Sequence, residues 1–206
     1  KKGPDYIDPM WLGRATGRPC INLDFYTMQH AEIEQRFQQY SKAADIALIE
    51  GNKGLYDGLD IDGSNSNAAL AQLLRSPVVL VIDVRGVTRG IAPLLLGYQA
   101  FCKDIQIAGV IFNQVGGRRH ESKLRTVIEH YTDIAVVGAV AKDPSMGIDE
   151  RHLGLVPSNE APQVENKIKT ISKLVAEQVD LDKLLEISRK APNMRPSTPW
   201  GLPSRS

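Results

Sequence analysis

Four unbroken runs of apolar residues constrain the fold of this chain more than any other feature of its sequence. They span residues 46–49, 78–82, 107–112 and 134–140. Runs this rich in Val and Ile are typical of strands buried on both faces, as in parallel sheets. Helical spacing of apolar residues marks the segments around them, at residues 33–40, 69–74, 88–103, 118–131 and 163–178. Strands that alternate with helices predict an α/β fold with a mostly parallel, doubly wound sheet, and 206 residues suffice for one such domain.

Polar residues end three of the four runs. Glu50, Asp83 and Asn113 each follow directly on apolar residues. Ligands of open parallel sheets bind at the carboxyl ends of the strands, so all three are candidate ligand contacts. Strand ends are also polar where they simply meet solvent, and for any single residue we weigh the two interpretations equally.

Residues 3–9 (GPDYIDP) place Asp5 and Asp8 in a turn that two prolines stiffen. A fixed turn with acids suits Mg²⁺, which takes one or two protein carboxylates and completes its shell with water and phosphate. Glu50 closes an apolar strand, where P-loop enzymes carry a second acid that organises Mg²⁺. Asp5, Asp8 and Glu50 are therefore candidate contacts to a metal ion.

A glycine-rich stretch, residues 50–58 (EGNKGLYDG), carries Lys53 and Asp57. Its three glycines predict a close backbone approach or special dihedral angles. Lys53 is suited to meet a phosphate or a substrate carboxylate as a point charge. The alternative is a surface turn with solvated charges.

Two further segments carry candidate polar contacts. Residues 63–67 (GSNSN) precede a helical stretch, where Ser and Asn cap helices and a helix start can bind an anion. Simple capping is the better interpretation for at least one of these residues. Arg151, in the polar stretch 149–157, has the geometry to clamp a carboxylate with two hydrogen bonds.

Composition limits the partners of this chain. The net charge is +1, and the sequence contains no block of Lys and Arg, no run long enough to span a membrane and no signal peptide. We therefore expect neither nucleic acid nor membrane as a partner. Cys20 and Cys102 fit no disulfide or metal spacing, which favours a cytoplasmic, reduced protein. After Leu185 the sequence becomes rich in proline, which predicts a linker over residues 191–206 or a frayed C-terminus.

Several stretches in series resemble the cobyrinic acid a,c-diamide synthase family, glutamine-dependent ATP amidoligases of corrinoids and related tetrapyrroles. In chain order they are GPDYIDP, ATGRP, EGNKGLYDG, SPVVLVIDVRG, AGVIFNQV and DERHLGLVPSNE, along most of residues 3–160. The family joins an ATP-binding P-loop domain, similar to dethiobiotin synthetase, to a glutaminase domain. The sequence contains neither the P-loop motif nor the glutaminase. The resemblance thus implies a synthetase domain over residues 1–190 without its first strand and P-loop, followed by a linker towards the glutaminase.

The resemblance also implies roles for particular residues. ATP would phosphorylate an acetate carboxylate of the tetrapyrrole, and ammonia would displace phosphate from the acyl phosphate. Mg²⁺ would be the cofactor, with Asp5 and Glu50 as its ligands. Catalytic roles fall to Asp5, Tyr6, Ile7, Glu50 and Asp57. Substrate contacts fall to Tyr6, Ile7, Lys53, Asp57 and Arg151. Asn113 matches the position that reads adenine, because an amide both donates and accepts hydrogen bonds.

Departures from the family pattern leave alternatives open. Residues 140–143 (VAKD) stand where relatives commonly have a Pro-Arg pair, and residues 63–67 replace a more usual Gly-Ser-Thr-Ala. The substrate is then cobyrinic acid or, within the same family, sirohaem or nickel-sirohydrochlorin. Outside amidation, the alternatives are a ParA/MinD-like switch ATPase and a non-catalytic tetrapyrrole-binding module. The family also allows a homodimer.

Overall fold

The computed structural model describes residues 1–148, 150–151 and 154–192. These residues form two compact units. The first unit consists of Lys1–Ser76 with Pro157–Asn159, and the second of Pro77–Val156 with Glu160–Ala191. Each unit is described by itself below.

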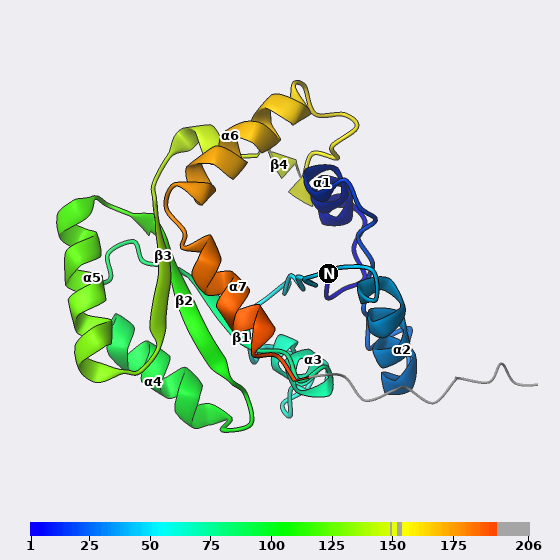
Figure 1. Ribbon diagram of the computed structural model, residues 1–206, viewed down its shortest axis with the longest axis horizontal. Helices are drawn as coiled ribbons and strands as arrows, with labels where there is room; N and C mark the ends of the chain where they lie inside the picture. The colour runs from blue at the N-terminus through cyan, green and yellow to red at the C-terminus, as the bar shows by residue number, and fades with distance from the viewer. Residues whose placement is uncertain (149, 152–153, 193–206) are drawn as a thin grey trace, which may run out of the picture. The chain divides into compact units, whose positions relative to one another are not determined.

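The second unit contains the parallel sheet that the apolar runs predict (Figure 1). Its strands are β1 (Val78–Asp83), β2 (Ile107–Val115) and β3 (Ala135–Ala141), in the order β1-β2-β3. Both neighbouring pairs run parallel. Near its end β2 loses register with β3, between Phe112 and Val115. This irregularity, at Asn113 and Gln114, is called the β2 bulge below.

Helices cover both faces of this sheet, which confirms the predicted α/β architecture (Figure 1). They are α4 (Ile91–Phe101), α5 (Arg118–Tyr131), α6 (Val164–Ala176) and α7 (Leu181–Arg189). Val137, Val140, Val179 and Ile187 pack together on the face towards α7, with Ile111 against them. Val110 and Phe112 alternate with Ile111 and therefore point to the other face, where Leu95 of α4 and Leu124 of α5 are fully buried.

Short elements follow β3 in the second unit. A 3₁₀ turn, η1 (Pro144–Met146), comes first, and the side chain of Asp143 caps it by accepting from the backbone N–H of Ser145 at 2.8 Å. The strands β4 (Glu150–Arg151) and β5 (Gly154–Leu155) then pair antiparallel. Among the described residues, no helix is both long and apolar enough to cross a membrane.

The first unit is built from α1 (Ile7–Thr16), α2 (His30–Ser41) and α3 (Asn67–Leu73). Its core joins Leu23, Ile33, Leu70 and Leu74, so the helical faces predicted over residues 33–40 and 69–74 are confirmed. Sequence periodicity did not predict α1 or, in the second unit, α7.

The strand predicted over residues 46–49 is wrong. The segment forms no strand, and the side chain of Leu48 is 88% exposed. A buried strand needs neighbours that pair with its backbone groups. In the described part of the first unit, the backbone bond next to this segment runs from the N–H of Lys2 to the carbonyl of Glu50, at 2.8 Å. Apolar sequence without a ladder partner therefore leaves the segment extended and irregular.

Candidate functional site

Three carboxylates of the first unit converge on one ammonium group. Nζ of Lys1 lies 3.2 Å from Oδ2 of Asp5 and 3.5 Å from Oε2 of Glu50, and it also contacts Oδ2 of Asp8. The Lys1 side chain is only 2% exposed. We call these four residues the Lys1 cluster. Two predicted metal ligands, Asp5 and Glu50, are thereby brought together.

The contacts within the Lys1 cluster shift the pKa values of Lys1 and Asp5. Burial would lower the pKa of the Lys1 ammonium, but the hydrogen bond to Asp8 and the charges of Glu50 and Asp5 raise it overall. Burial would likewise raise the pKa of Asp5, but hydrogen bonds from Lys1 and from its other neighbours hold it below the usual value. Both groups are therefore charged at neutral pH.

Lys1 is a site residue that the sequence reading missed. It stands only two positions before the GPDYIDP motif, which was the available signal. Its burial depends on Glu50, which is remote in sequence, so the motif alone could not show that Lys1 would meet three acids.

The turn that carries Asp5 is fixed at two points. Oδ1 of Asp5 accepts from the backbone N–H of Ile7 at 3.0 Å, and Nδ2 of Asn22 donates to the Asp5 carbonyl at 2.5 Å. Tyr6 precedes α1, and its ring is 69% exposed, whereas Ile7 begins the helix and is half-buried. The turn therefore fixes the carboxylate of Asp5 and leaves Tyr6 exposed to solvent, and the contact of Tyr6 and Ile7 with a substrate stays a prediction.

Lys53 and Asp57 lie on the glycine-rich stretch, and both are exposed. The backbone N–H of Asp57 donates to the Gly54 carbonyl at 3.2 Å, which closes a turn. The carboxylate of Asp57 lies so close to the Gly54 backbone that a Cβ at residue 54 would overlap Oδ2 of Asp57. The close backbone approach predicted for these glycines is confirmed at this position.

Segment 63–67 caps helix α3, as expected. Oγ of Ser66 accepts from the backbone N–H of Ala69 at 3.1 Å. Asn65 instead holds the preceding turn, because its Oδ1 accepts from the N–H of Leu59 at 2.8 Å. The capping interpretation is therefore confirmed for Ser66.

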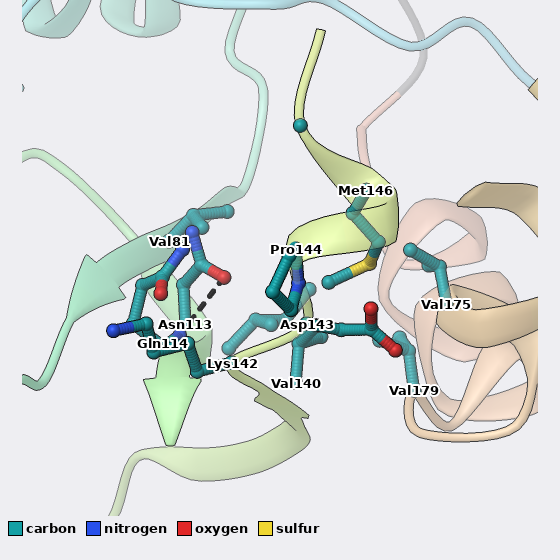
Figure 2. A pocket seen from close by; sticks show the side chains of 12 residues that line it. Val81, Asn113, Gln114, Val140, Lys142, Asp143, Pro144, Met146, Val175 and Val179 are labelled. Carbon is teal, nitrogen blue, oxygen red and sulfur yellow. Dashed lines mark hydrogen bonds between the residues drawn. The ribbon is translucent and has the colours of Figure 1, made fainter. Parts of the chain in front are cut away.

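The second unit contains a cavity of about 590 Å³ at the carboxyl ends of β2 and β3 (Figure 2). Its polar lining consists of Asn113, Gln114, Lys142 and Asp143. Its apolar walls are Val81, Ile111, Val140, Met146, Val175 and Val179. An apolar cavity with a few polar groups is typical of small-molecule sites.

Asn113 is held in this cavity by the β2 bulge. Gln114 has a φ of +62°, in the left-handed region, and its N–H donates to Oδ1 of Asn113 at 3.0 Å (Figure 2). The backbone thus orients the Asn113 amide, and the prediction that this residue lines a ligand site at a strand end agrees with its place.

The Lys1 cluster offers a suitable donor pair for Mg²⁺. Asp5 and Glu50 supply two carboxylates, and Oε2 of Glu50 is buried without a hydrogen-bond partner. No group of three or more His, Cys, Asp and Glu side chains in the described ranges is placed to hold a metal ion. Two carboxylates nevertheless suit Mg²⁺, because water and phosphate complete its shell.

Arg151 belongs to β4, whose backbone pairs with β5. Its contact with a substrate carboxylate stays a prediction. Asp149 and His152, in the same polar stretch, lie outside the described residues.

Comparison with known proteins places this chain in a family. Residues 21–148 match a family model described as an AAA domain, and because this is more than half of the chain, the chain belongs to that family. The chain is also similar along its whole length to proteins named cobyrinate a,c-diamide synthase, which confirms the resemblance that the motifs indicate.

Three such relatives show the extent of the match. The protein of Magnetococcus marinus is 42% identical over 100% of this chain, and the match covers 44% of the relative. That of Methanosarcina acetivorans is 42% identical over 92% of the chain and 40% of the relative. That of Listeria innocua is 40% identical over 96% of the chain and 44% of the relative. The chain thus spans less than half the length of these relatives, and no solved structure matches it.

Proposed function

We propose that the protein carrying this chain amidates acetate carboxylates of cobyrinic acid, with ATP as activator and glutamine as the source of ammonia. The observation that carries the proposal is the convergence of Asp5 and Glu50 on buried Lys1, because the family motifs imply catalytic roles for both acids. The names of the relatives supply the substrate class.

The reaction brings anions together. A carboxylate oxygen of the substrate attacks the γ-phosphorus of ATP, the bond to ADP breaks, and an acyl phosphate forms. Ammonia then attacks the acyl carbon, phosphate leaves with the bonding electrons, and an amide remains. When bound, Mg²⁺ would neutralise phosphate charge at the first of these steps.

Residues of this chain would prepare that chemistry. Asp5 and Glu50 would hold Mg²⁺, and Lys1 would keep both carboxylates oriented. The exposed ring of Tyr6, with Ile7 behind it, would contact the tetrapyrrole. Lys53 would contact a peripheral carboxylate of the substrate, and Asp57 would act in substrate handling and turnover. Arg151, in the second unit, is a separate candidate for binding a substrate carboxylate. The glutaminase is expected beyond this chain, and cytoplasmic location and homodimer formation belong to the same proposal.

We propose the cavity of the second unit as the site of the adenine base. Its walls are apolar, as a stacked base requires, and the Asn113 amide supplies a donor at its polar edge. Lys142 and Asp143 also line the cavity, at positions where the family commonly has a Pro-Arg pair.

The test uses the intact protein, with its phosphate-binding and glutaminase segments. Cobyrinic acid, sirohaem and nickel-sirohydrochlorin are each incubated with ATP, Mg²⁺ and glutamine, and mass spectrometry follows the conversion of carboxylates into amides. Amidation of cobyrinic acid above the other two supports the proposal. ATP hydrolysis that no tetrapyrrole stimulates would instead indicate a switch ATPase, and tetrapyrrole binding without amide formation would indicate a binding module.

A further inference from the structure

The side chain of Asn67 reaches back from the start of α3 to the glycine-rich stretch. Its Nδ2 donates to two successive carbonyls, that of Lys53 at 2.9 Å and that of Gly54 at 3.2 Å. One amide group therefore holds the backbone on both sides of the Lys53–Gly54 peptide bond.

Gly51 shows how closely the two segments meet. A Cβ at residue 51 would lie 2.9 Å from both Cγ and Nδ2 of Asn67, which is nearer than real side chains approach. The plane of the Asn67 amide thus rests against the Gly51 backbone. Its Oδ1 is buried there without a hydrogen-bond partner. The cost of this unsatisfied oxygen is offset by the two hydrogen bonds that Nδ2 donates.

Asn67 is anchored in the rigid part of the first unit. Ser66 caps the helix that begins at Asn67, and one turn further on Leu70 and Leu74 are each 2% exposed in the core. The four residues Gly51–Gly54 are by contrast all exposed. Asn67 thus offers a hydrogen-bond donor from the helix to an exposed loop, and its side chain restrains the backbone of that loop.

We propose that Asn67 is a positioning residue, which fixes the loop of residues 51–57 and through it the placement of Lys53 and Asp57. The consequence for catalysis rests on the function proposed above, whereas the effect on the loop does not. Asn65 supports the next turn through Leu59 but donates to neither of these two carbonyls.

The decisive variant is Asn67→Asp in the intact protein. Its shape is unchanged, but a carboxylate cannot donate and would face two carbonyl oxygens. Asn67→Ala removes the donor without adding charge and serves if the aspartate variant unfolds. Asn166→Asp, at an exposed position of α6, is the matched control for the charge change.

Hydrogen–deuterium exchange of a peptide covering residues 51–58 is measured without substrate. We expect the Asp57 amide, whose N–H donates to the Gly54 carbonyl that Asn67 also holds, to exchange about tenfold faster in both Asn67 variants and at an unchanged rate in Asn166→Asp. In the amidation assay we expect kcat to fall about tenfold or more while the KM for ATP stays within about twofold.

The two proposals fail in different ways. Unchanged exchange in both Asn67 variants would overturn the positioning role, whatever the activity. Faster exchange together with absence of amidation in the unmodified protein would support the positioning role and reject the proposed reaction. Faster exchange with unaltered kcat in an active enzyme would overturn the claim that the loop places Lys53 and Asp57 for catalysis.

Discussion

Lys1 and Glu50 are joined twice, once through side chains and once through the backbone beside them. Nζ of Lys1 lies 3.5 Å from Oε2 of Glu50, and the N–H of Lys2 donates to the Glu50 carbonyl at 2.8 Å. The backbone bond restrains the main chain of Glu50, from which its side chain extends. The Lys1 ammonium therefore meets a carboxylate whose position is already restricted.

Replacing Lys1 by Met is expected to lower the free energy of unfolding by about 1–3 kcal/mol, since it leaves three carboxylates without their shared cation. The estimate lies below that for a fully buried pair because the carboxylates are partly exposed. Urea unfolding measures the effect. The control is Lys183→Met, which removes an exposed pair with Glu186 and should cost less than about 1 kcal/mol. Equal losses of unfolding free energy in the two variants would mean that the burial of Lys1 does not strengthen its ion pairs.

The contribution of the Lys1 cluster to the free energy of unfolding should decrease at both low and high pH. The pKa of Asp5 is lowered on folding, so its contribution is present above the unfolded value of about 4 and is lost as pH falls through the lowered pKa. The pKa of Lys1 is raised, so its contribution is complete below about pH 10.4 and is lost as pH rises through the raised pKa. The difference in unfolding free energy between the unmodified protein and Lys1→Met should therefore be flat between these limits. A difference that slopes steadily across neutral pH would contradict the assignment.

Replacing Glu50 by Gln should leave folding intact and lower turnover about a hundredfold to a thousandfold, because a neutral amide binds Mg²⁺ poorly and stabilises less charge. Amide formation from cobyrinic acid measures turnover, and circular dichroism checks the fold. Glu129→Gln, on the exposed side of α5, is the matched control. Unchanged turnover in Glu50→Gln would remove Glu50 from the mechanism.

Replacing Asn113 by Ala should weaken ATP binding about fivefold to a hundredfold, through loss of hydrogen bonds to the base. Calorimetric titration of the intact protein with ATP measures the change, and Asn166→Ala provides the comparison. If the cavity of the second unit holds the base, GTP binding should respond less than ATP binding. Equal loss for both nucleotides would place Asn113 away from the base.

Sequence alone predicted the sheet of the second unit because all three strands carry continuous apolar runs. The expected burial on both faces is wrong for β1, where Val81 is 65% exposed, because β1 is an edge strand of this sheet. The run at residues 46–49 has the same composition, yet Leu48 is exposed. Composition reports how well a segment suits a strand, whereas forming the strand also requires a neighbour with free backbone groups. Whether such a neighbouring segment is present depends on the whole fold.

The helices that were missed have local explanations. Helix α1 contains Pro9 and Gly13 and shows little separation of apolar from polar faces. Helix α7 lies where proline-rich sequence begins, although Asp180 caps it by accepting from the N–H of Lys183 at 2.8 Å. In the site, Asp5 and Glu50 were predicted from motifs, but Lys1 and Asn67 act through contacts across the sequence that no short motif contains.

The β2 bulge determines how this protein can change over evolutionary time. The orientation of Asn113 depends on the count of residues between Phe112 and Val115 and on the left-handed backbone of Gln114. Side chains along this edge can therefore be exchanged one at a time, and a glycine at position 114 would even relieve its backbone. Deleting one residue would instead reverse the facing of everything beyond it. Substitutions can thus change which ligand this edge would prefer, whereas a change in its backbone geometry requires the insertion or deletion of a residue.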